Sequence, residues 1–472
     1  MKSSQKQISV HLTTLGCPKN RVDSEHILGS LLNDHHHYQE DPQKAEVIIV
    51  NTCGFIHEAK QESIDTIIEM AEYKNAGSCK TLIVTGCLSQ LYGKDLKSEI
   101  PELDYVLGID AYQKLPEILE SVANPKESDA YEEWEHPEHL IDFEPKFLHS
   151  SSMPRVNSLF PHSAYLKISE GCNNTCSFCT IPKIRGKQRS RSIDDLIKET
   201  KSLAKQGVKE INLLAQDLTA YGYDLNPRTS LGYLLQSLVE IEGIEWIRLH
   251  YAYPRPFSPK LWEMLQHPKV CKYIDMPLQH ISDNVLKLMK RGHNTAYIMK
   301  KLNELRSRLN GLYMRTSFVV GFPGETDKDF QQLVDFVKDQ QFEWMGVFEY
   351  SNEEHSAAYQ LADQVPDHVK KERRHILMNM QKKMSHKKLQ QQIGKEFVVL
   401  VDGVSDETDL LLEARHYGMA PKVDGKIYIN DGIANVGDFV RVKIESAHEY
   451  DLIAKICNKD DTHYSLSQPA CT

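Results

Sequence analysis

The sequence has no apolar run long enough to cross a lipid bilayer, since unbroken stretches such as 397–401 cover only a few residues. It also has no apolar segment after the basic residues near its start, so no secretory leader is expected. These absences predict a cytoplasmic protein that contacts no membrane. The 472 residues exceed one small module and suggest about three domains, each large enough to bury its own core.

An excess of positive charge is also missing. The chain has 56 lysines and arginines against 66 aspartates and glutamates, a formal net charge of −10. A negative chain repels nucleic acid at long range unless basic residues are locally concentrated. The balance favours a protein or a small molecule as substrate.

Ten cysteines are present, although a reducing compartment makes a disulfide framework unexpected. Three short β-branched runs each end on a cysteine, at Cys17, Cys53 and Cys87. The intervals of 36 and 34 residues match the length of a βαβ unit, and helical patterns lie between the runs. Because parallel strands end at one edge of their sheet, the three thiols are predicted to converge on a cluster site. The alternative is a set of buried, inert thiols.

The sequence predicts three domains with two connecting or terminal segments. We expect an open parallel α/β domain over residues 1–145, followed by a linker over 146–163. A central α/β domain is expected over 164–393, a small all-β barrel of OB-like type over 394–458 and a tail over 459–472. The linker belongs to a stretch rich in proline and acidic residues, without periodicity.

Six strands separated by helical segments predict a partial or full α/β barrel in the central domain. The strands are expected at residues 164–169, 210–215, 245–250, 273–277, 315–321 and 344–349. A long basic helix is expected over 367–393, where Ile376, Leu377 and Met380 either pack against the barrel or leave the cations free to touch RNA. We favour packing.

Cys172, Cys176 and Cys179 form the pattern CxxxCxxC directly after the first central strand, on the face where α/β barrels hold their active sites. Structural zinc requires four ligands, and no second cysteine pair or histidine follows at finger spacing. Electron-transfer iron–sulfur clusters usually take four thiolates. Three thiolates leave one iron open to a substrate or a cofactor.

The segment GCNNTCSFC at the end of the first barrel strand resembles the signature of the radical S-adenosylmethionine superfamily. The resemblance implies a 4Fe–4S cluster on Cys172, Cys176 and Cys179, whose open iron binds S-adenosylmethionine and cleaves it to a 5′-deoxyadenosyl radical. Phe178 resembles the aromatic position beside the adenine, although simple core packing explains it equally well. The barrel's task is then to position the cofactor and exclude water.

The N-terminal segments LGCPKNRVDSE, NTCGFI and TGCLSQ, joined to such a barrel and a terminal β-barrel, resemble the methylthiotransferases over nearly the whole chain. The resemblance implies that Cys17, Cys53 and Cys87 hold a second 4Fe–4S cluster that carries the inserted sulfur. It also implies two molecules of S-adenosylmethionine per turnover, with an electron donor and a sulfur donor as partners.

The segments AQDLTAYGYD, MPLQHISDNVLKLMKRG and EYSNEEHSAAY resemble the RimO branch, which modifies the β-carbon of an aspartate in a small-subunit ribosomal protein of the decoding centre. The terminal barrel resembles the TRAM domain, usually associated with RNA. Here twelve acidic residues outnumber seven basic ones between Gly394 and Ile456, which suits a basic protein partner. A modified adenosine in transfer RNA remains the alternative substrate.

Other residues carry weaker predictions. Gln216 and Asp217 follow the second barrel strand on the active-site face, where they are candidates for binding the ribose or amino group of the cofactor. Alternating basic residues after the cysteine motif either hold a carboxylate or form a solvated loop; they are Lys183, Arg185, Lys187, Arg189 and Arg191.

Overall fold

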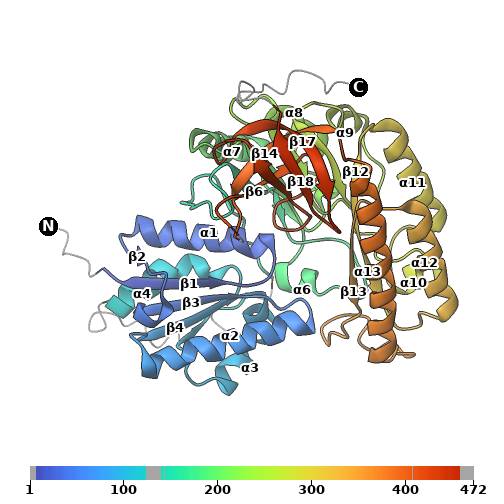
Figure 1. The fold of residues 1–472 in the computed structure, drawn as a ribbon. Helices are drawn as coiled ribbons and strands as arrows, with labels where there is room; N and C mark the ends of the chain where they lie inside the picture. The colour runs from blue at the N-terminus through green and yellow to red at the C-terminus, as the bar shows by residue number, and fades with distance from the viewer. Residues whose placement is uncertain (1–6, 124–139, 143, 407, 458–472) are drawn as a thin grey trace.

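The computed structural model describes residues 7–123, 140–142, 144–406 and 408–457. Residues 124–139, in the last part of the predicted N-terminal domain, and the predicted tail 459–472 lie outside the described residues. The chain forms an N-terminal domain, a central open barrel and a small C-terminal barrel that lies against the central one (Figure 1). Among the described helices, none is long and apolar enough to span a membrane.

The N-terminal domain is a parallel sheet of strand order β2-β1-β3-β4-β5, as the βαβ spacing predicts. Its strands are β1 (Ser9–Thr14), β2 (His37–Tyr38), β3 (Val47–Thr52), β4 (Thr81–Gly86) and β5 (Tyr105–Val106). Its helices are α1 (Pro18–Asn33), α2 (His57–Ala76), α3 (Cys87–Glu99) and α4 (Leu115–Ala123), with short 3₁₀ turns η1 (Pro42–Lys44) and η2 (Ala111–Lys114).

Both faces of this sheet are buried, because successive residues of a strand point to opposite sides. Val47 and Ile49 of β3 pack with α1 and α4 in one apolar cluster. Ile48 and Val50 pack with α2 and α3 in another. The continuous apolar run of β3 therefore reflects a central strand covered by helices on both sides.

The central domain is an open parallel sheet of strand order β13-β12-β11-β10-β9-β6, which makes it a partial rather than a full barrel. Its strands are β6 (Ser163–Lys167), β9 (Glu210–Leu214), β10 (Trp246–Leu249), β11 (Val270–Asp275), β12 (Tyr313–Val320) and β13 (Trp344–Glu349). A small antiparallel pair, β7 (Ser169–Glu170) and β8 (Arg189–Ser190), flanks the cysteine loop.

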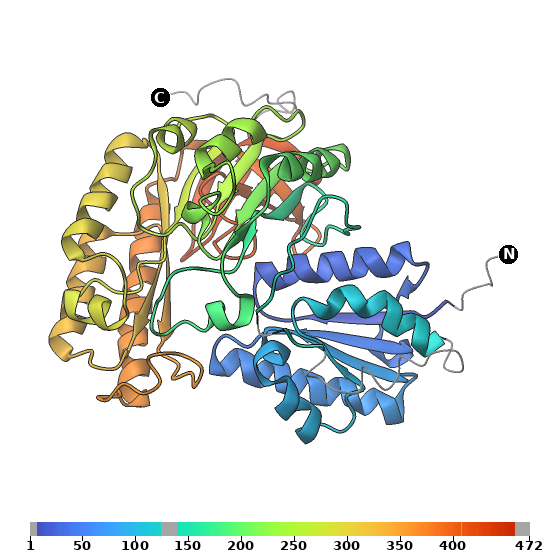
Figure 2. The same ribbon diagram turned by 180° about the vertical axis from the view of Figure 1, so that it is seen from behind.

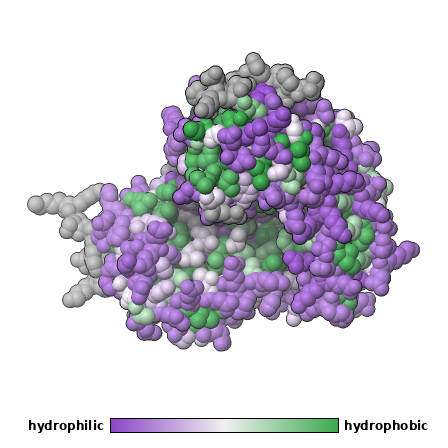
Figure 3. Space-filling model, in the orientation of Figure 1, coloured by the Kyte–Doolittle hydropathy of each residue, from purple (hydrophilic) through white to green (hydrophobic). Residues whose placement is uncertain are grey.

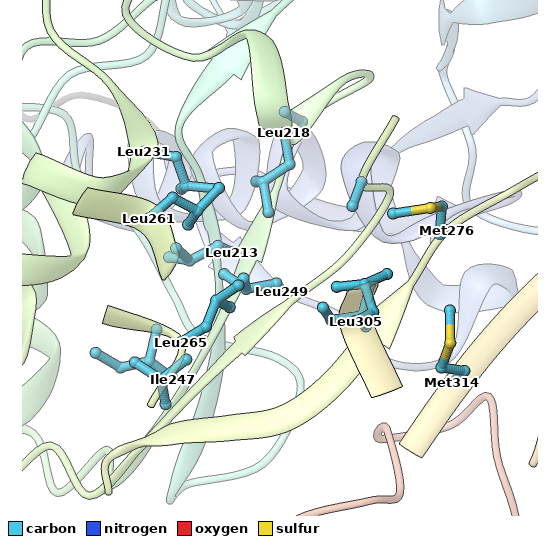
Figure 4. Close-up of a cluster of buried hydrophobic side chains, with 14 of the residues drawn as sticks. Leu213, Leu218, Leu231, Ile247, Leu249, Leu261, Leu265, Met276, Leu305 and Met314 are labelled. Atoms are coloured by element: carbon cyan, nitrogen blue, oxygen red, sulfur yellow. The ribbon is translucent and has the colours of Figure 1, made fainter. Parts of the chain in front are cut away.

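Helices cover the outside of this sheet, and two short helical segments, α6 (Ile181–Arg185) and η4 (Leu218–Ala220), lie at its edge. The covering helices are α7 (Ile193–Lys205), α8 (Leu231–Leu238), α9 (Pro259–Met264), α10 (Asp283–Leu288), α11 (Thr295–Arg308), α12 (Asp327–Gln340) and α13 (Asp367–Gln390). Figure 4 shows part of the resulting core, in which leucines of β9, β10 and the helices meet Met276 and Met314. Ser192 and Thr326 cap α7 and α12, and Thr326 forms the full capping box with Asp329.

The long helix α13 packs against the barrel, as favoured from its pattern. Leu377 is fully buried, and Met380 is partly buried against the central core. Ile376 is 37% exposed, so its predicted packing is wrong. It directly precedes the buried Leu377, and two consecutive residues of a helix do not share one face.

The C-terminal domain is a closed barrel of strand order β14-β15-β16-β18-β17, which confirms the predicted small all-β barrel. Its strands are β14 (Glu396–Val404), β15 (Leu412–His416), β16 (Ile427–Asp431), β17 (Phe439–Ala447) and β18 (Leu452–Ile456). Its core continues into the central domain through Trp246, Tyr273 and Trp344, which lie on three of the central strands.

Buried charges also join these two barrels. Arg415 donates to Glu210 at 2.8 Å, and Tyr273 donates to Asp424 at 2.8 Å. Asp402 is buried, and the side chain of Asp424 has no exposed surface. Two of the acidic residues counted in the terminal barrel therefore lie at the domain junction and add no negative charge to its free surface.

Candidate cluster and cofactor site

The three N-terminal cysteines lie at the carboxyl ends of neighbouring strands. Cys53 directly follows β3, Cys87 directly follows β4, and Cys17 comes three residues after β1. A Cβ atom added to Gly16 would lie only 2.7 Å from the Cβ of Cys53, so the first two strand ends are in direct contact. The sheet brings the predicted trio to one edge.

Asn20 links the three strand ends. Its side-chain amide donates to the carbonyl of Leu15 at 3.1 Å and to that of Thr52 at 2.8 Å. Its Oδ1 lies 3.5 Å from the Sγ of Cys87. Asn20 is fully buried, so this buried amide fixes the loop after β1 against the ends of β3 and β4.

The thiols of this trio act on one another electrostatically. Burial first, and then Cys87, raise the pKa of Cys53 to about 12. Cys17 occupies the N-cap position of α1 without a side-chain capping bond, and Cys87 is the first residue of α3; at both positions the helix dipole favours a thiolate. None of the three forms a disulfide. The donor set fits a metal cluster, which would displace the thiol protons on binding.

The second trio lies in the loop between β7 and α6, at the carboxyl end of β6. Gly171 has a φ of +76°, and a Cβ there would lie 2.2 Å from the carbonyl oxygen of Lys187, so the loop can start only with glycine. The amide of Cys172 donates to Gly186 at 3.1 Å, which closes the loop. Burial raises the pKa of Cys179 to about 12, and both other thiols contribute. Three facing thiols fit a cluster with one open iron.

A guanidinium donates to one sulfur of each trio. Arg291 lies 3.3 Å from the Sγ of Cys176 and also donates to the carbonyl of Pro277 at 2.9 Å. Arg185 lies 3.4 Å from the Sγ of Cys87 and donates to Asn20 Oδ1 at 2.6 Å. Such bonds favour the thiolate form that ligates metal.

Arg185 belongs to α6, just after the second trio, yet its partners lie mostly in the N-terminal domain. It donates to Asp23 at 2.8 Å and lies 3.4 Å from Glu170. Both views of the ribbon show α6 between the two domains (Figures 1 and 2). Arg185 is buried, and the carboxylates and the Cys87 thiol raise its pKa against the effect of burial.

Lys167 completes this buried charge cluster. Its ammonium contacts Asp23 and lies 2.6 Å from Glu170. Burial would raise the pKa of Glu170, but Lys167 and Arg185 outweigh it and hold that pKa low. Asp23, His149 and Glu170 bring possible ligand atoms within 4.8 Å of one another, but the two cations already occupy the space beside these carboxylates.

Two further contacts join the domains. Arg155 lies between Glu25 of α1, at 2.6 Å, and Glu199 of α7, at 2.5 Å. Lys60 of α2 lies 2.5 Å from Glu353, in the segment after β13. That segment also reaches the second trio, since the amide of Ala358 donates to the carbonyl of Ser177 at 2.7 Å.

Gln216 lies beside the charge cluster, where its side-chain amide donates to Glu170 at 2.7 Å. Its Oε1 is buried and has no hydrogen-bond partner among the described residues. Phe178 is partly buried against Met289 and Phe322, so it has the packing role that the sequence allowed. Asp217 accepts from Asn174 at 2.8 Å and contacts Arg255, so within the protein it braces the cysteine loop.

The basic loop after the cysteines is not uniformly solvated. Arg185 and Arg191 are buried in ion pairs, and Arg191 lies 2.6 Å from both Asp195 and Glu199. Lys183 and Lys187 are exposed. In this loop the two buried arginines therefore have a structural role, whereas the two exposed lysines are solvated.

Sequence reasoning missed three residues of this region and did not distinguish a fourth from its neighbours. Asn20, Lys19 and Arg291 carry no local signal, and Arg185 was singled out only as one cation among five. Lys19 of α1 reaches across to the central domain, where its Nζ lies 3.4 Å from the centre of the Tyr251 ring. Burial lowers the pKa of Lys19, and the Cys17 thiol opposes that shift.

The comparisons with known proteins agree with this architecture. Residues 9–108 match the Uncharacterized protein family UPF0004, residues 166–337 the Radical SAM superfamily and residues 393–457 the TRAM domain. A radical S-adenosylmethionine methyltransferase of known structure, TsrM from Kitasatospora setae, shares the fold. Its TM-score is 0.54 at 14% identity, covering 75% of this chain and 77% of that one.

The fold and the match to the Radical SAM superfamily define the class, an enzyme whose cofactors are S-adenosylmethionine and iron–sulfur clusters. Proteins named ribosomal protein uS12 methylthiotransferase RimO are similar over nearly the full length. That of Myxococcus xanthus (strain DK1622) is 49% identical over 96% of this chain and 92% of its own. That of Geobacter sulfurreducens (strain ATCC 51573 / DSM 12127 / PCA) is 45% identical over 97% and 100%. The chain belongs to the RimO family of radical S-adenosylmethionine methylthiotransferases.

Proposed function

We propose that this enzyme transfers a methylthio group to the β-carbon of an aspartyl residue of ribosomal protein uS12, in the cytoplasm. The relatives named for the modification of uS12 support the substrate. The observation that carries the proposal is the position of Arg185. It follows the second cysteine trio in the chain and donates to Cys87 of the first, so both trios border one site.

In this proposal Cys172, Cys176 and Cys179 hold the 4Fe–4S cluster that binds S-adenosylmethionine, and Cys17, Cys53 and Cys87 hold a second 4Fe–4S cluster. When bound, these groups supply the radical that activates the aspartyl C–H bond and the sulfur that is inserted. An electron donor and a sulfur donor serve as further partners, and two molecules of S-adenosylmethionine are used per turnover.

The protein's own side chains orient these groups. Arg291 and Arg185 donate to the sulfurs of Cys176 and Cys87, which favours the thiolates as ligands. The unpartnered Oε1 of Gln216 is available to accept from the amino group or the ribose of S-adenosylmethionine. Phe178 supplies an aromatic surface next to the cysteine loop for the adenine. In Figure 3 the surface is hollowed between the N-terminal domain and the central barrel.

The test separates the two trios by their products. After anaerobic reconstitution, each variant is incubated with uS12, S-adenosylmethionine and a chemical reductant. Cys172→Ala, Cys176→Ala and Cys179→Ala are expected to stop the formation of 5′-deoxyadenosine. Cys17→Ala, Cys53→Ala and Cys87→Ala are expected to leave it intact while no methylthiolated uS12 is detected by mass spectrometry.

Cys79→Ala is the matched control, because Cys79 is a buried cysteine of the same N-terminal domain, just before β4, and lies outside both trios. It is expected to retain both products. Continued formation of 5′-deoxyadenosine by the variants of the second trio would contradict the proposed assignment of the clusters. A wild-type enzyme that methylthiolates transfer RNA and leaves uS12 unmodified would refute the proposed substrate.

A further inference from the structure

Lys19 occupies the space between the two domains. It is the second residue of α1, two positions after Cys17, and it is only partly buried. Its Nζ lies 3.4 Å from the centre of the Tyr251 ring, and Tyr251 is in the loop that follows β10 of the central barrel. An N-terminal side chain thus reaches the carboxyl-end face of the barrel, where the active sites of such folds lie.

The ammonium of Lys19 is the unpaired cation of this junction. Over residues 7–123, 140–142, 144–406 and 408–457 it has neither a hydrogen bond nor an ion pair, and it lies against the face of the Tyr251 ring. Lys167, Arg185 and Arg155 differ, because each pairs with two carboxylates. A ring face attracts a cation but accepts none of the three N–H bonds that an ammonium donates.

Two carboxylates act on the charge of Lys19, and each of them has another cation near it. Asp275 and Glu170 both act on the charge of Lys19. Glu170 lies 2.6 Å from Lys167, and Asp275 lies 3.9 Å from Arg315. Within the described residues neither carboxylate accepts a hydrogen bond from Lys19, so its N–H donors, two residues after Cys17, are free to bind an incoming carboxylate.

We propose that Lys19 binds the side-chain carboxylate of the aspartyl residue that is modified, and so selects aspartate over asparagine. This inference rests on the proposed function. The carboxylate carbon of aspartate is bonded directly to its β-carbon. A carboxylate held two residues after Cys17 therefore places the β-carbon next to the trio assigned to the inserted sulfur. Lys19 is a binding residue in this scheme and exchanges no proton with the substrate.

The experiment measures selectivity rather than turnover alone. Labelled uS12, and the same protein with the target aspartate changed to asparagine, are titrated anaerobically with reconstituted enzyme. A charge-assisted hydrogen bond predicts that wild-type enzyme binds the aspartate form about tenfold more tightly. Lys19→Met is expected to bind the two forms equally, and Lys19→Arg to keep most of the preference.

Lys183→Met is the matched control, because Lys183 is an exposed lysine near the second trio. It is expected to leave the preference unchanged. Its iron content and its formation of 5′-deoxyadenosine without uS12 are also expected to match wild type, and both are measured in every variant. If Lys19→Met loses iron, the comparison of Lys19→Arg with wild type still decides, and a complete loss of the preference with arginine present overturns the inference.

Two other outcomes also refute the role of Lys19. An unchanged preference in Lys19→Met removes it from substrate binding. Weaker binding of S-adenosylmethionine in Lys19→Met, measured by equilibrium dialysis with the aspartate preference intact, assigns Lys19 to the carboxylate of the cofactor. Failure of wild-type enzyme to modify uS12 is a distinct result, because it refutes the proposed function itself.

Discussion

The two cysteine trios, which we propose as cluster ligands, are assembled in different ways. The second trio occupies eight consecutive residues of one loop, and Gly171 together with backbone hydrogen bonds shapes it locally. The first trio is spread over three strand ends and meets only when β1, β3 and β4 pair. A ligand set within one loop can be recognised from its spacing, whereas a set assembled by a sheet depends on the tertiary structure of the whole domain.

The largest expected effect concerns iron. Changing Cys17, Cys53 and Cys87 together to alanine should reduce the iron of reconstituted enzyme from about eight to about four atoms per chain, as two four-iron clusters require. Changing Cys172, Cys176 and Cys179 should remove the other four. Iron and acid-labile sulfide are measured after anaerobic reconstitution. If either triple variant kept all its iron, the division into two sites would be wrong.

The second effect compares the two guanidinium groups. Arg185→Met leaves the buried carboxylates of Asp23 and Glu170 with Lys167 alone and should lower the unfolding free energy by about 3–5 kcal/mol. Arg291→Met removes a bond to the carbonyl of Pro277 and a bond to Cys176 and should cost about 1–2 kcal/mol. Urea unfolding of the iron-free proteins measures both. Equal losses of unfolding free energy in the two variants would show that the two guanidinium groups stabilise the fold to the same extent.

The third effect concerns the ion pairs of Arg155 that hold α1, the helix after Cys17, to α7 of the central barrel. Burial would raise the pKa of Glu199, but Arg191 and Arg155 lower it to about 2, from 4.5. Because the pKa of Glu199 is lower in the folded protein than in the unfolded one, its negative charge stabilises the fold at pH values above the unfolded-state pKa. This contribution is lost as the pH falls from about 4.5 towards 2. Glu199→Gln should therefore be less stable than wild type at pH 7 by about 3 kcal/mol, and the difference should shrink over that acidic range.

Glu263→Gln is the control for this pH series, since the pair of Glu263 with Lys260 is exposed at the carboxylate. Exposed pairs contribute about 0–1 kcal/mol, so its stability should follow wild type at every pH. A difference between wild type and Glu199→Gln that stays constant down to pH 2 would contradict the role of the ion pairs.

The smallest effect concerns the glycines that precede the cysteines. Gly86 has a φ of +102°, and a Cβ there would lie 2.5 Å from the carbonyl oxygen of Thr52. Gly86→Ala and Gly171→Ala should each cost at least about 1–2 kcal/mol and reduce iron binding at the adjacent trio only. Gly207→Ala, which has a positive φ and open space around it, should leave both iron sites intact.

Periodicity predicted the elements of the fold better than their ends. The strand expected over 273–277 is β11, Val270–Asp275, because the polar Lys272 interrupts its apolar pattern and hides the start. Helix α1 begins at Pro18, earlier than its apolar pattern suggests, and proline in the first turn marks that start. The two-residue strands β2 and β5 are too short to leave a pattern.

The six cysteines were predicted from local patterns, but the residues that join their sites were not. Arg155 lies in the predicted linker, yet its side chain is buried between carboxylates of two domains. Asn20 and Lys19 act through partners 32 and more residues away in sequence. Such partners are chosen by tertiary packing, which a single sequence does not record.

The shared core of the two barrels bears on how this chain can be divided. The terminal barrel has the sequence borders of a portable module, but Trp246, Tyr273 and Trp344 of the central strands belong to its core. Cutting the chain before β14 would uncover these aromatic rings and leave Glu210 without Arg415. The boundary visible in the sequence therefore does not separate two independently folding units, and a fragment that ends before β14 would expose an apolar surface prone to aggregation. Exchange of this module between relatives requires the central strands to change with it.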